Sequence, residues 1–482
     1  MRPHPVPQRQ DRRGHPLGSV LRRPQDATAP VPQSRACHGT FRQGDAPGTA
    51  RCYNSFVNRA IAAGGQAGGA PGPWWLGHVA WRELHPVTRR LIAARAVRSL
   101  GQGALTVDFV LFLGALGWSA GAIGALVGAS SLAGAALSLA AGALTDRLGR
   151  RPFLLGFQIA IAVLTLGVLV NPAPWLLVVA TVLCGYGRGG GGSAGPFAPA
   201  ERAWLAQNVP AAQRGRTFSL NSAAGFVGMG LGALLGSAVP LLQHWLPGAA
   251  AYRALFALVA AAAVVNYGQL VGVREERPAV APKPAEAERT VRRRENRAVG
   301  ALMGVSAVSA LGRAVYGPLL PYWFAVRFGA GPASIGPIYA AGFLLATLSA
   351  LGTGELATRL GLVRSIVAVR LISIATLVAM PLMPAFGWAA ALYMLRSVLG
   401  RGVSGARQAF TVSLVRDRRR GLASGLSTAA RRVPASVGPA IGGWLMGLGE
   451  LDLPFYIGAA IQLIYAGLFA TVFRGMEPAE EE

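Results

Sequence analysis

The chain has 482 residues, of which 52% are hydrophobic and only 14% are charged, whereas soluble domains carry about 25% charged residues. Together with a mean hydropathy of +0.42, this composition excludes an ordinary water-soluble enzyme. The three cysteines, Cys37, Cys52 and Cys184, are too few for a disulfide scaffold and lack the spacing of zinc ligands, so we expect no metal and no cofactor.

Residues 1–87 are rich in Pro, Gly, Arg and Gln and have no apolar periodicity. Such a segment cannot bury enough apolar surface to offset the entropy lost on ordering, so we predict a disordered cytoplasmic tail. Its arginines contribute to the net charge of +26, but we expect them to be solvated, and we expect no nucleic-acid partner. A mis-annotated start is a second interpretation: no methionine occurs between Met1 and Met229, so a start near residue 85 would use another codon, for example at Val79 or Val87.

From Leu91 onward, apolar runs of about 20 residues recur, and each is long enough to cross a hydrocarbon core of about 30 Å as a helix. The runs are uninterrupted and lack the alternation of barrel strands. The sequence therefore predicts an all-α membrane protein with twelve transmembrane helices. The predicted spans 1 to 12 are 91–115, 120–143, 153–171, 174–196, 217–241, 252–272, 299–326, 333–353, 362–383, 387–412, 422–446 and 453–473.

Arginines mark the connections that follow even-numbered spans and are almost missing from the others. By the positive-inside rule, both termini face the cytoplasm. The longest internal polar stretch, 273–298, is predicted to be a cytoplasmic linker between two six-helix bundles, 88–272 and 299–474. An acidic tail, 475–482, ends the chain.

An internal repeat supports this division. Five patterns of the first half recur in order in the second half, at offsets between 206 and 213 residues. They are Leu100-Gly101 with Leu311-Gly312, Gly117 and Ile123-Gly124 with Gly329 and Ile335-Gly336, Gly142 and Arg147-Leu148-Gly149 with Gly354 and Arg359-Leu360-Gly361, Gly187-Arg188-Gly189 with Gly400-Arg401-Gly402, and Arg214-Gly215 with Arg420-Gly421. Parallel halves of this kind place a substrate site between them, near the middle of the bilayer.

The connection between spans 2 and 3 reads Gly-Ala-Leu-Thr-Asp-Arg-Leu-Gly-Arg-Arg, from Gly142 to Arg151. Gly142 allows a neighbouring helix to approach closely, and Gly149 permits a tight turn. Asp146 offers an acceptor to the N-terminal amides of a helix or to an arginine. A plain positively charged anchor followed by a turn is the alternative interpretation.

This string resembles the signature loop of the major facilitator superfamily, G-x-x-x-D-R-x-G-R-R, at every specified position. A degenerate copy runs from Gly354 to Arg364, with Thr358 in place of the aspartate. The resemblance covers about residues 88–474 and implies the fold of two six-helix bundles. In that family the loop stabilises the outward-facing state, so the resemblance implies a conformational latch formed by Gly142, Asp146, Arg147, Gly149 and Arg151.

Asp108 stands near the middle of span 1. An intramembrane carboxylate is a candidate protonation site or a partner for a cationic substrate, and the alternative is a fixed interhelical ion pair. Candidate partners are Arg98, Arg313 and Arg401.

Arg188 in span 4 resembles the family's R-x-x-Q-G motif, with Gly191 in place of the glutamine. The resemblance implies a part in proton transfer; an arginine that reaches the cytoplasmic rim or locks Asp146 is the alternative. We therefore take Asp108, Arg188, Arg313 and Arg401 as the candidates for proton or substrate coupling.

Two spans are rich in glycine, and we expect these residues to pack helices closely. They are Gly228, Gly232 and Gly236 in span 5, and Gly438, Pro439 and Gly442 in span 11. The string G-P-x-x-G-G resembles a motif that drug–proton antiporters carry in span 5, but here it stands in span 11.

Three aromatic residues of span 7, Tyr316, Tyr322 and Trp323, lie near two prolines, where a broken helix would expose stacking surface to a substrate; an aromatic belt at the lipid interface is the alternative. Arginines also outnumber acids in the C-terminal spans, which suits a cavity for an anionic or polar solute. They are Arg370, Arg396, Arg407, Arg431 and Arg432.

We interpret the chain as a secondary active transporter of the cell membrane, driven by a proton gradient and monomeric. Few polar residues line the spans, so efflux of drug-like or amphipathic compounds is our first hypothesis. Transport of a polar or anionic metabolite is the second, and a non-transporting membrane receptor is the third. We do not expect an enzyme, because the sequence has no catalytic triad, zinc-protease or phosphate-loop string.

Overall fold

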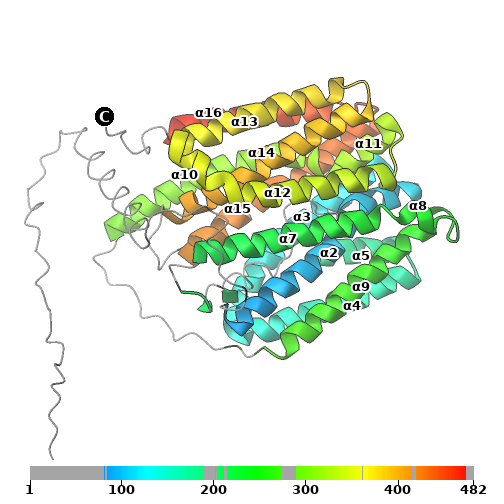
Figure 1. Cartoon of the computed structure of the whole chain (residues 1–482), viewed down its shortest axis with the longest axis horizontal. Coiled ribbons are helices and arrows are strands. Elements are labelled where there is room, and N and C mark those ends of the chain that lie inside the picture. Colours follow the sequence, from blue (N-terminus) through cyan, green and yellow to red (C-terminus); the bar gives the residue numbers. More distant parts are fainter. Residues whose placement is uncertain are drawn as a thin grey trace, which may run out of the picture. The chain divides into compact units, whose positions relative to one another are not determined.

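The structure is a computed structural model, and every residue that it describes belongs to one compact unit, Ala50–Glu482. Nearly all of the predicted tail 1–87, Arg188 and the acidic tail 475–482 lie outside the described residues. Those described are 81, 84–187, 201, 204, 205, 207–210, 214–273, 275, 289–360, 362–413 and 420–473. Within these ranges the secondary structure is entirely helical, and the long helices run alongside one another (Figure 1).

Within the described part of the N-terminal half, the structure has five long helices and two short ones. They are α2 (Pro86–Ala115), α3 (Ala120–Leu148), α4 (Arg150–Val170), α5 (Pro174–Cys184), α7 (Arg214–Gly236), α8 (Val239–Leu242) and α9 (Arg253–Val271), with a 3-10 turn, η3 (Gly248–Tyr252), before α9. Local chemistry explains several boundaries. Prolines stand in the first turn of α2 and α5, where a missing amide hydrogen is harmless, and the Ser119 hydroxyl caps α3 by accepting from the Ala122 amide at 3.2 Å.

The C-terminal half repeats this arrangement. Its elements are α10 (Arg289–Ala314), η5 (Gly317–Leu319), α11 (Leu320–Phe328), α12 (Pro332–Leu360), α13 (Leu362–Ala379), η6 (Met380–Leu382), α14 (Phe386–Ser413), α15 (Arg420–Gly447) and α16 (Leu453–Phe473). Most predicted spans agree with these bounds to within about five residues. α12 ends seven residues after the predicted end of span 8, and the other differences are described next.

Three predicted spans are not continuous helices. Span 5 is divided into α7 and α8, with residues 237 and 238 between them. Span 4 was expected to run to residue 196, but α5 ends at Cys184 because Gly185 adopts the left-handed conformation (φ 81°) that terminates helices. Span 7 is divided into α10, η5 and α11. Pro318 and Pro321 stand in the first turns of η5 and α11, since proline cannot continue the preceding helix. In addition, α10 begins at Arg289, inside the predicted linker 273–298.

Six helical segments among the described residues are long and apolar enough to cross a membrane. They are Pro86–Ala115, Ala120–Ser138, Arg150–Val170, Thr217–Leu242, Gly248–Val271 and Leu453–Val472. Three further apolar segments are shorter: Pro174–Cys184, Pro332–Leu348 and Ile366–Leu382. In α10, α14 and α15 many side chains lie outside the described set. The described helices are those of a protein that crosses the membrane many times.

Equivalent helix pairs form the core of each half. In the N-terminal half α2 packs against α7 and α9, and in the C-terminal half α10 packs against α15 and α16. Glycines allow both approaches: a Cβ on Gly232 of α7 would collide with the Leu100 carbonyl of α2, and one on Gly442 of α15 would collide with the Val315 carbonyl that follows α10. Gly228 and Gly236 likewise face α2, and Gly438 faces the end of α10.

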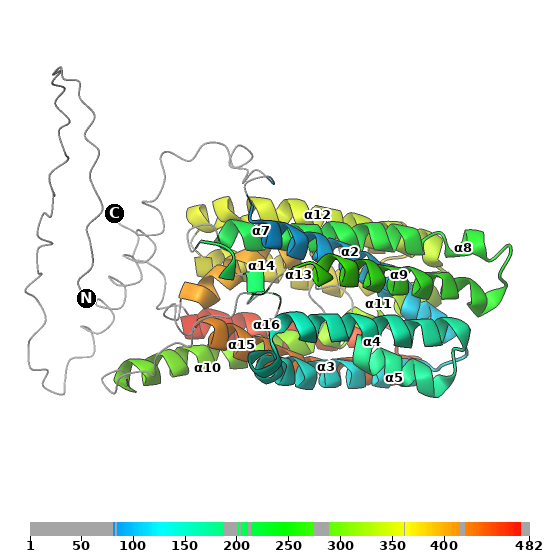
Figure 2. The ribbon, with the colours of Figure 1, turned by 90° about the horizontal axis from the view of Figure 1, so that it is seen from below.

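Two helix pairs make the most extensive contacts between the halves, and α2 also touches α11 and α12. α3 lies along α15, and α7 lies along α12 (Figures 1 and 2). Gly124 of α3 faces the carbonyl of Pro439, and Gly443 of α15 faces that of Ala120, so neither position has room for a side chain. Phe226 and Phe343 stack across the second pair with ring centres 6.5 Å apart. We call these two contacts the α3–α15 seam and the α7–α12 seam.

Candidate functional site

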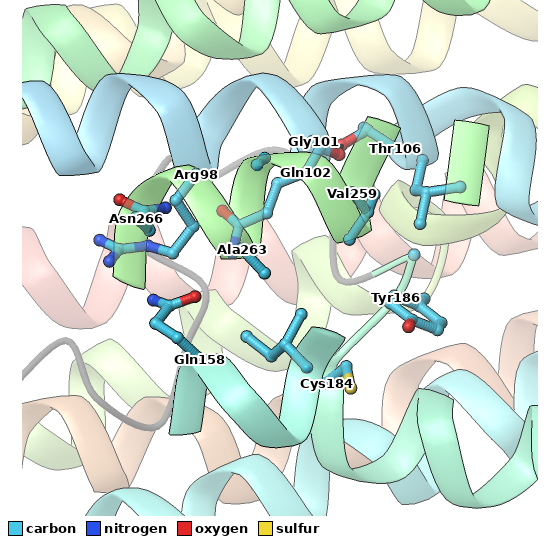
Figure 3. Close-up of a pocket in the computed structure, with 14 residues that line it drawn as sticks. Arg98, Gly101, Gln102, Thr106, Gln158, Cys184, Tyr186, Val259, Ala263 and Asn266 are labelled. Atoms are coloured by element: carbon cyan, nitrogen blue, oxygen red, sulfur yellow. Dashed lines mark hydrogen bonds between the residues drawn. The ribbon is translucent and has the colours of Figure 1, made fainter. Parts of the chain in front are cut away.

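A small cavity lies inside the N-terminal half, between α2, α4, α9 and the end of α5 (Figure 3). Its volume is about 40 Å³. Polar side chains reach it from three helices: Arg98 and Gln102 from α2, Gln158 from α4 and Asn266 from α9. Cys184 and Tyr186 line it from the end of α5 and the residues after it. The cavity is therefore a polar pocket within one half, distinct from the seams between the halves.

A buried ion pair stands at this pocket. Nη2 of Arg98 donates to Oε2 of Glu201 at 2.5 Å, and the two side chains are 9% and 4% exposed. The pair ties α2 to the segment that precedes α7 and neutralises the arginine. Sequence analysis had considered Arg98 as a partner of Asp108 and had missed Glu201. The sequence offered one indication of this pair, because Glu201 is an acidic residue between two apolar spans.

Two amide side chains at the pocket lack partners. Gln158 is 1% exposed and Asn266 is fully buried, and both polar atoms of each amide have no hydrogen-bond partner in the structure. Leaving a buried polar group unsatisfied costs about 1–3 kcal/mol. Sequence analysis had not singled out either residue, because a single glutamine or asparagine in an apolar span carries no motif.

Asp108 lies elsewhere on α2, against α7. It is 1% exposed, neither carboxylate oxygen has a hydrogen-bond partner, and a Cβ on Gly236 would collide with Oδ2. Of the three proposed partners, Arg98 binds Glu201, Arg313 donates to the Ser309 hydroxyl at 2.7 Å, and the side chain of Arg401 lies outside the described set. Asp108 is thus a buried carboxyl without an ion-pair partner among the described side chains.

The signature loop is held by a residue that sequence analysis had missed. Gly149 makes the turn between α3 and α4 with φ 91°, and the Glu275 carboxylate accepts the amides of Arg150 and Arg151, each at 2.9 Å. A carboxylate at a helix N-terminus is favoured by the helix dipole. The guanidinium of Arg151 also donates to the Val271 carbonyl at the end of α9.

Glu275 is thus an acceptor for the first amides of α4, and the prediction that Asp146 accepts from helix amides or from an arginine stays a prediction. The side chains of Asp146 and Arg147 lie outside the described set, and Gly142 lies within α3. A latch role for the five predicted residues stays a prediction. Glu275 was hard to find from sequence because 126 positions separate it from Gly149.

The predicted substrate aromatics lie in the C-terminal half. Tyr316 (1% exposed) stacks on Phe455 with ring centres 5.7 Å apart, and the indole nitrogen of the fully buried Trp323 donates to Asp452 at 3.3 Å. Tyr322 is half-buried and packs against the same core. These rings fill the helix core in this conformation, so their contact with a substrate stays a prediction.

Arg396 of α14 meets Tyr316 at the broken stretch between α10 and α11. Its Nη1 donates to the tyrosine Oη at 2.6 Å, and its guanidinium lies 4.9 Å from the ring centre. The Nε of Arg396 is buried and has no hydrogen-bond partner. Among the described residues, no carboxylate forms an ion pair with the Arg396 guanidinium. The adjacent turn η5 contacts α3 of the other half, so this cation lies close to where the halves meet.

The sequence profile of the major facilitator superfamily matches this chain twice, over residues 91–303 and 302–482. A comparison with functionally curated proteins finds no match. Several solved structures have a similar fold. A bacterial homologue of the human lysosomal transporter Spinster, in an inward-facing and unoccupied conformation, is 15% identical, with a TM-score of 0.62 over 83% of this chain and 98% of that chain.

A D-xylose–proton symporter is 17% identical, with a TM-score of 0.62 over 80% of this chain and 97% of its own. The human organic anion transporter MFSD10 is 15% identical, with a TM-score of 0.55 over 81% of this chain and all of its own. At such identities the likeness shows the fold alone. Because the profile matches cover both helical halves in succession, the chain belongs to the major facilitator superfamily.

Proposed function

We propose that the protein is a secondary active transporter that moves a small solute across the cell membrane by alternating access. The observation that carries this proposal is the pair of seams between two halves built alike. Each half has its own glycine-packed core, α2–α7 or α10–α15, while the halves touch each other along α3–α15 and α7–α12. Two stiff bundles joined along two helix pairs are suited to rocking against each other around a central site.

Coupling to protons is the next step of the proposal, with Asp108 as the carrier. Its carboxyl is buried, has no ion-pair partner among the described side chains, and contacts α7, the helix that also forms a seam with the other half. A proton on this group is thereby coupled to the position of α7. The D-xylose–proton symporter, which shares the fold, is named as a proton-coupled protein.

The polar side chains buried in the helices bear on the choice between drug efflux and transport of a polar or anionic solute. Efflux of amphipathic compounds was favoured because few polar residues were expected within the spans. The described helices instead bury arginines and amides, among them Arg95, Arg98, Gln158, Asn266 and Gln462. We therefore favour the second hypothesis, a polar or anionic solute, over drug efflux.

Arg396 is the observation that points to negative charge on the solute. It lies ten residues after Phe386, the start of α14, or about 15 Å along the helix, which is half of a hydrocarbon core of about 30 Å. A cation at such depth is costly and usually marks a substrate or ion pathway. A carboxylate, phosphate or sulfonate group would supply the missing counter-charge.

The test is transport into proteoliposomes that contain the full chain, across a panel of anionic, neutral and cationic solutes, with and without a pH gradient. We expect gradient-driven flux of an anion. Asp108→Asn should remove the response to the gradient but keep solute exchange. Arg396→Gln should lower anion uptake about ten- to hundredfold, which is the loss of one charge-assisted hydrogen bond.

Arg327→Gln is the matched control, because Arg327 is exposed in the last turn of α11. Ligand binding without flux would instead support a receptor, and flux of an uncharged amphipathic compound that is unaffected by Arg396→Gln would restore the efflux hypothesis. The orientation with both termini in the cytoplasm is part of the proposal; an accessibility tag in the connection 276–288 should be reached from the cytoplasmic side only.

A further inference from the structure

The internal repeat relates the pocket of the N-terminal half to a filled region of the C-terminal half. Arg98 and Gln102 each stand 211 positions before Ser309 and Arg313, and Gln158 stands 212 positions before Arg370. These are the offsets of the sequence repeat, so three polar positions of the pocket recur as polar positions in α10 and α13.

In the C-terminal half these positions are occupied by protein contacts. Nε2 of Gln462 in α16 donates to the Ser309 carbonyl at 2.8 Å, and Arg313 donates to the Ser309 hydroxyl. The guanidinium of Arg370 lies over the ring of Tyr465, 5.1 Å from its centre. Side chains of α16 thus complete the polar interior of this half.

In the N-terminal half one of these groups, Gln158, has no protein partner and lines the pocket together with Asn266 of α9. Gln158 and Asn266 offer two donor nitrogens and two acceptor oxygens, and none of them has a protein partner. Figure 3 shows the two side chains on opposite helices, beside Arg98 and Gln102 at the pocket. Buried polar groups are nearly always hydrogen-bonded, to ordered water if not to protein.

The backbone beside the pocket is a second, independent observation. α5 has only 11 residues, which is about 16 Å of helix, so the chain leaves helical geometry well inside a hydrocarbon core of about 30 Å. Gly185 and Gly187 have φ values of 81° and 70°, and Tyr186 and Gly187 line the pocket. Non-helical backbone at membrane depth is tolerated where protein buries it or where it lines a water-filled cavity.

Size and charge limit what can occupy the pocket. A volume of about 40 Å³ holds two or three water molecules, whereas sites for drug-sized ligands measure about 300–1,000 Å³. The charge of Arg98 is matched by Glu201, so the pocket does not demand a charged ligand. Its occupant must be small and neutral and must both donate and accept hydrogen bonds.

We propose that this pocket is an internal water site, in which a cluster of two or three ordered water molecules bonds the amides of Gln158 and Asn266. Water completes in the N-terminal half what Gln462 and Tyr465 complete in the C-terminal half. The site is separate from the solute pathway between the halves, and it stands whether or not the transported solute is an anion.

Hydroxyl-radical labelling by X-ray radiolysis tests the proposal on the full chain in lipid nanodiscs. Radicals form from water, so a buried side chain is oxidised quickly only when water is bound beside it. Cys184 and Tyr186 line the pocket and are the reporters, and Met229 and Met380 are buried, reactive references that do not line it. We expect oxidation of the reporters to be about tenfold faster than that of the references.

Two variants that change different residues lining the pocket distinguish bound water from unspecific labelling. Gln158→Leu with Asn266→Leu removes the groups that hold the water, and Ala263→Val narrows the pocket without touching the amides. Each should lower labelling of Cys184 and Tyr186 about tenfold. Gln243→Leu, the same change at an exposed position after α8, should not.

Reporter rates equal to those of Met229 and Met380 in the unmodified protein would overturn the water site, whatever the variants do. Fast labelling that persists in both variants would also overturn it, because water would then reach the reporters by another route.

Discussion

The two halves of the molecule share three polar positions of the repeat, 98 with 309, 102 with 313 and 158 with 370, but differ in how these groups are satisfied. In the C-terminal half Ser309, Arg313 and Gln462 form protein hydrogen bonds. In the N-terminal half Arg98 instead pairs with the buried Glu201, and two amides without protein partners line a pocket. The repeat therefore preserves some polar positions, while the hydrogen-bond partners at these positions differ between the halves.

Under the proposed function, the two halves have different roles in transport. The N-terminal half holds the unpaired carboxyl of Asp108, suited to carrying a proton. The C-terminal half holds the unpaired cation Arg396 beside a broken helix, suited to binding an anion. Among the described residues, the unpaired carboxyl and this cation thus lie in different halves, as a transport cycle with relative motion of the halves would require.

The largest difference between the halves should be seen at equivalent positions 98 and 309. Arg98→Ala strands the Glu201 carboxylate in the protein interior, so we expect the free energy of unfolding to fall by about 3–5 kcal/mol. Ser309→Ala removes the acceptor of a charge-assisted hydrogen bond from Arg313 and should cost about 1.5–3 kcal/mol. Unfolding in mixed micelles measures both.

The double variant Arg98→Met with Glu201→Met is the control, because it removes both charges together. It should recover most of the loss. Equal costs for the two alanine variants would contradict the assignment of the ion pair.

The next difference concerns the amides. Gln462→Leu breaks a buried bond to the Ser309 carbonyl and should lower the free energy of unfolding by about 1–3 kcal/mol. Asn266→Leu loses only bonds to water and should change it by less than about 1 kcal/mol. Thermal unfolding of the two variants measures both changes. A larger fall in the free energy of unfolding for Asn266→Leu than for Gln462→Leu would mean that the Asn266 amide has a protein partner.

Substitution of the packing glycines should destabilise the two halves to a similar degree, because each half packs its central helices through a glycine. Gly232→Ala and Gly442→Ala place a methyl group against a backbone carbonyl, and each should destabilise its half by about 1–3 kcal/mol. Gly268→Ala and Gly467→Ala are matched controls, since nothing lies within 4 Å of a Cβ there. Those two changes should be neutral or stabilising by up to about 1 kcal/mol. Tolerance of alanine at position 232 alone would show that the two cores are built differently.

The smallest expected effect is at the helix end that Glu275 caps. Glu275→Gln keeps an acceptor but removes the charge, and the free energy of unfolding should fall by about 0.3–1 kcal/mol. Added salt should shrink the difference. A loss that is independent of salt would point to packing rather than to the helix dipole.

Much of the fold could be predicted because apolar length is a local property. The ends of α2, α3, α9 and α16 lie within five residues of the predicted span ends, since Pro86, Ser119 and the flanking polar residues mark them. The early end of α5 could not be predicted with equal ease, because Gly185 and its neighbours read as small residues that helices in membranes tolerate.

Candidate site residues could be predicted only where a charged residue stands within an apolar span. Asp108 and Arg396 stand out in apolar spans, and both prove to lack a carboxylate–cation partner among the described residues. Glu201, Glu275 and Asn266 acquire meaning only from contacts with residues that are distant in the chain, so no local pattern reveals them.

The amino-acid sequence by itself determined the membrane class, the two-part organisation and the family, because hydropathy, arginine placement and a contiguous motif are written along the chain. Tertiary structure decided which charges are paired, where α10 and α11 divide, and which buried amides face a pocket. The physical reason is that hydrogen bonds and ion pairs depend on distances of about 3 Å between side chains, and the chain sets those distances only when its helices have packed.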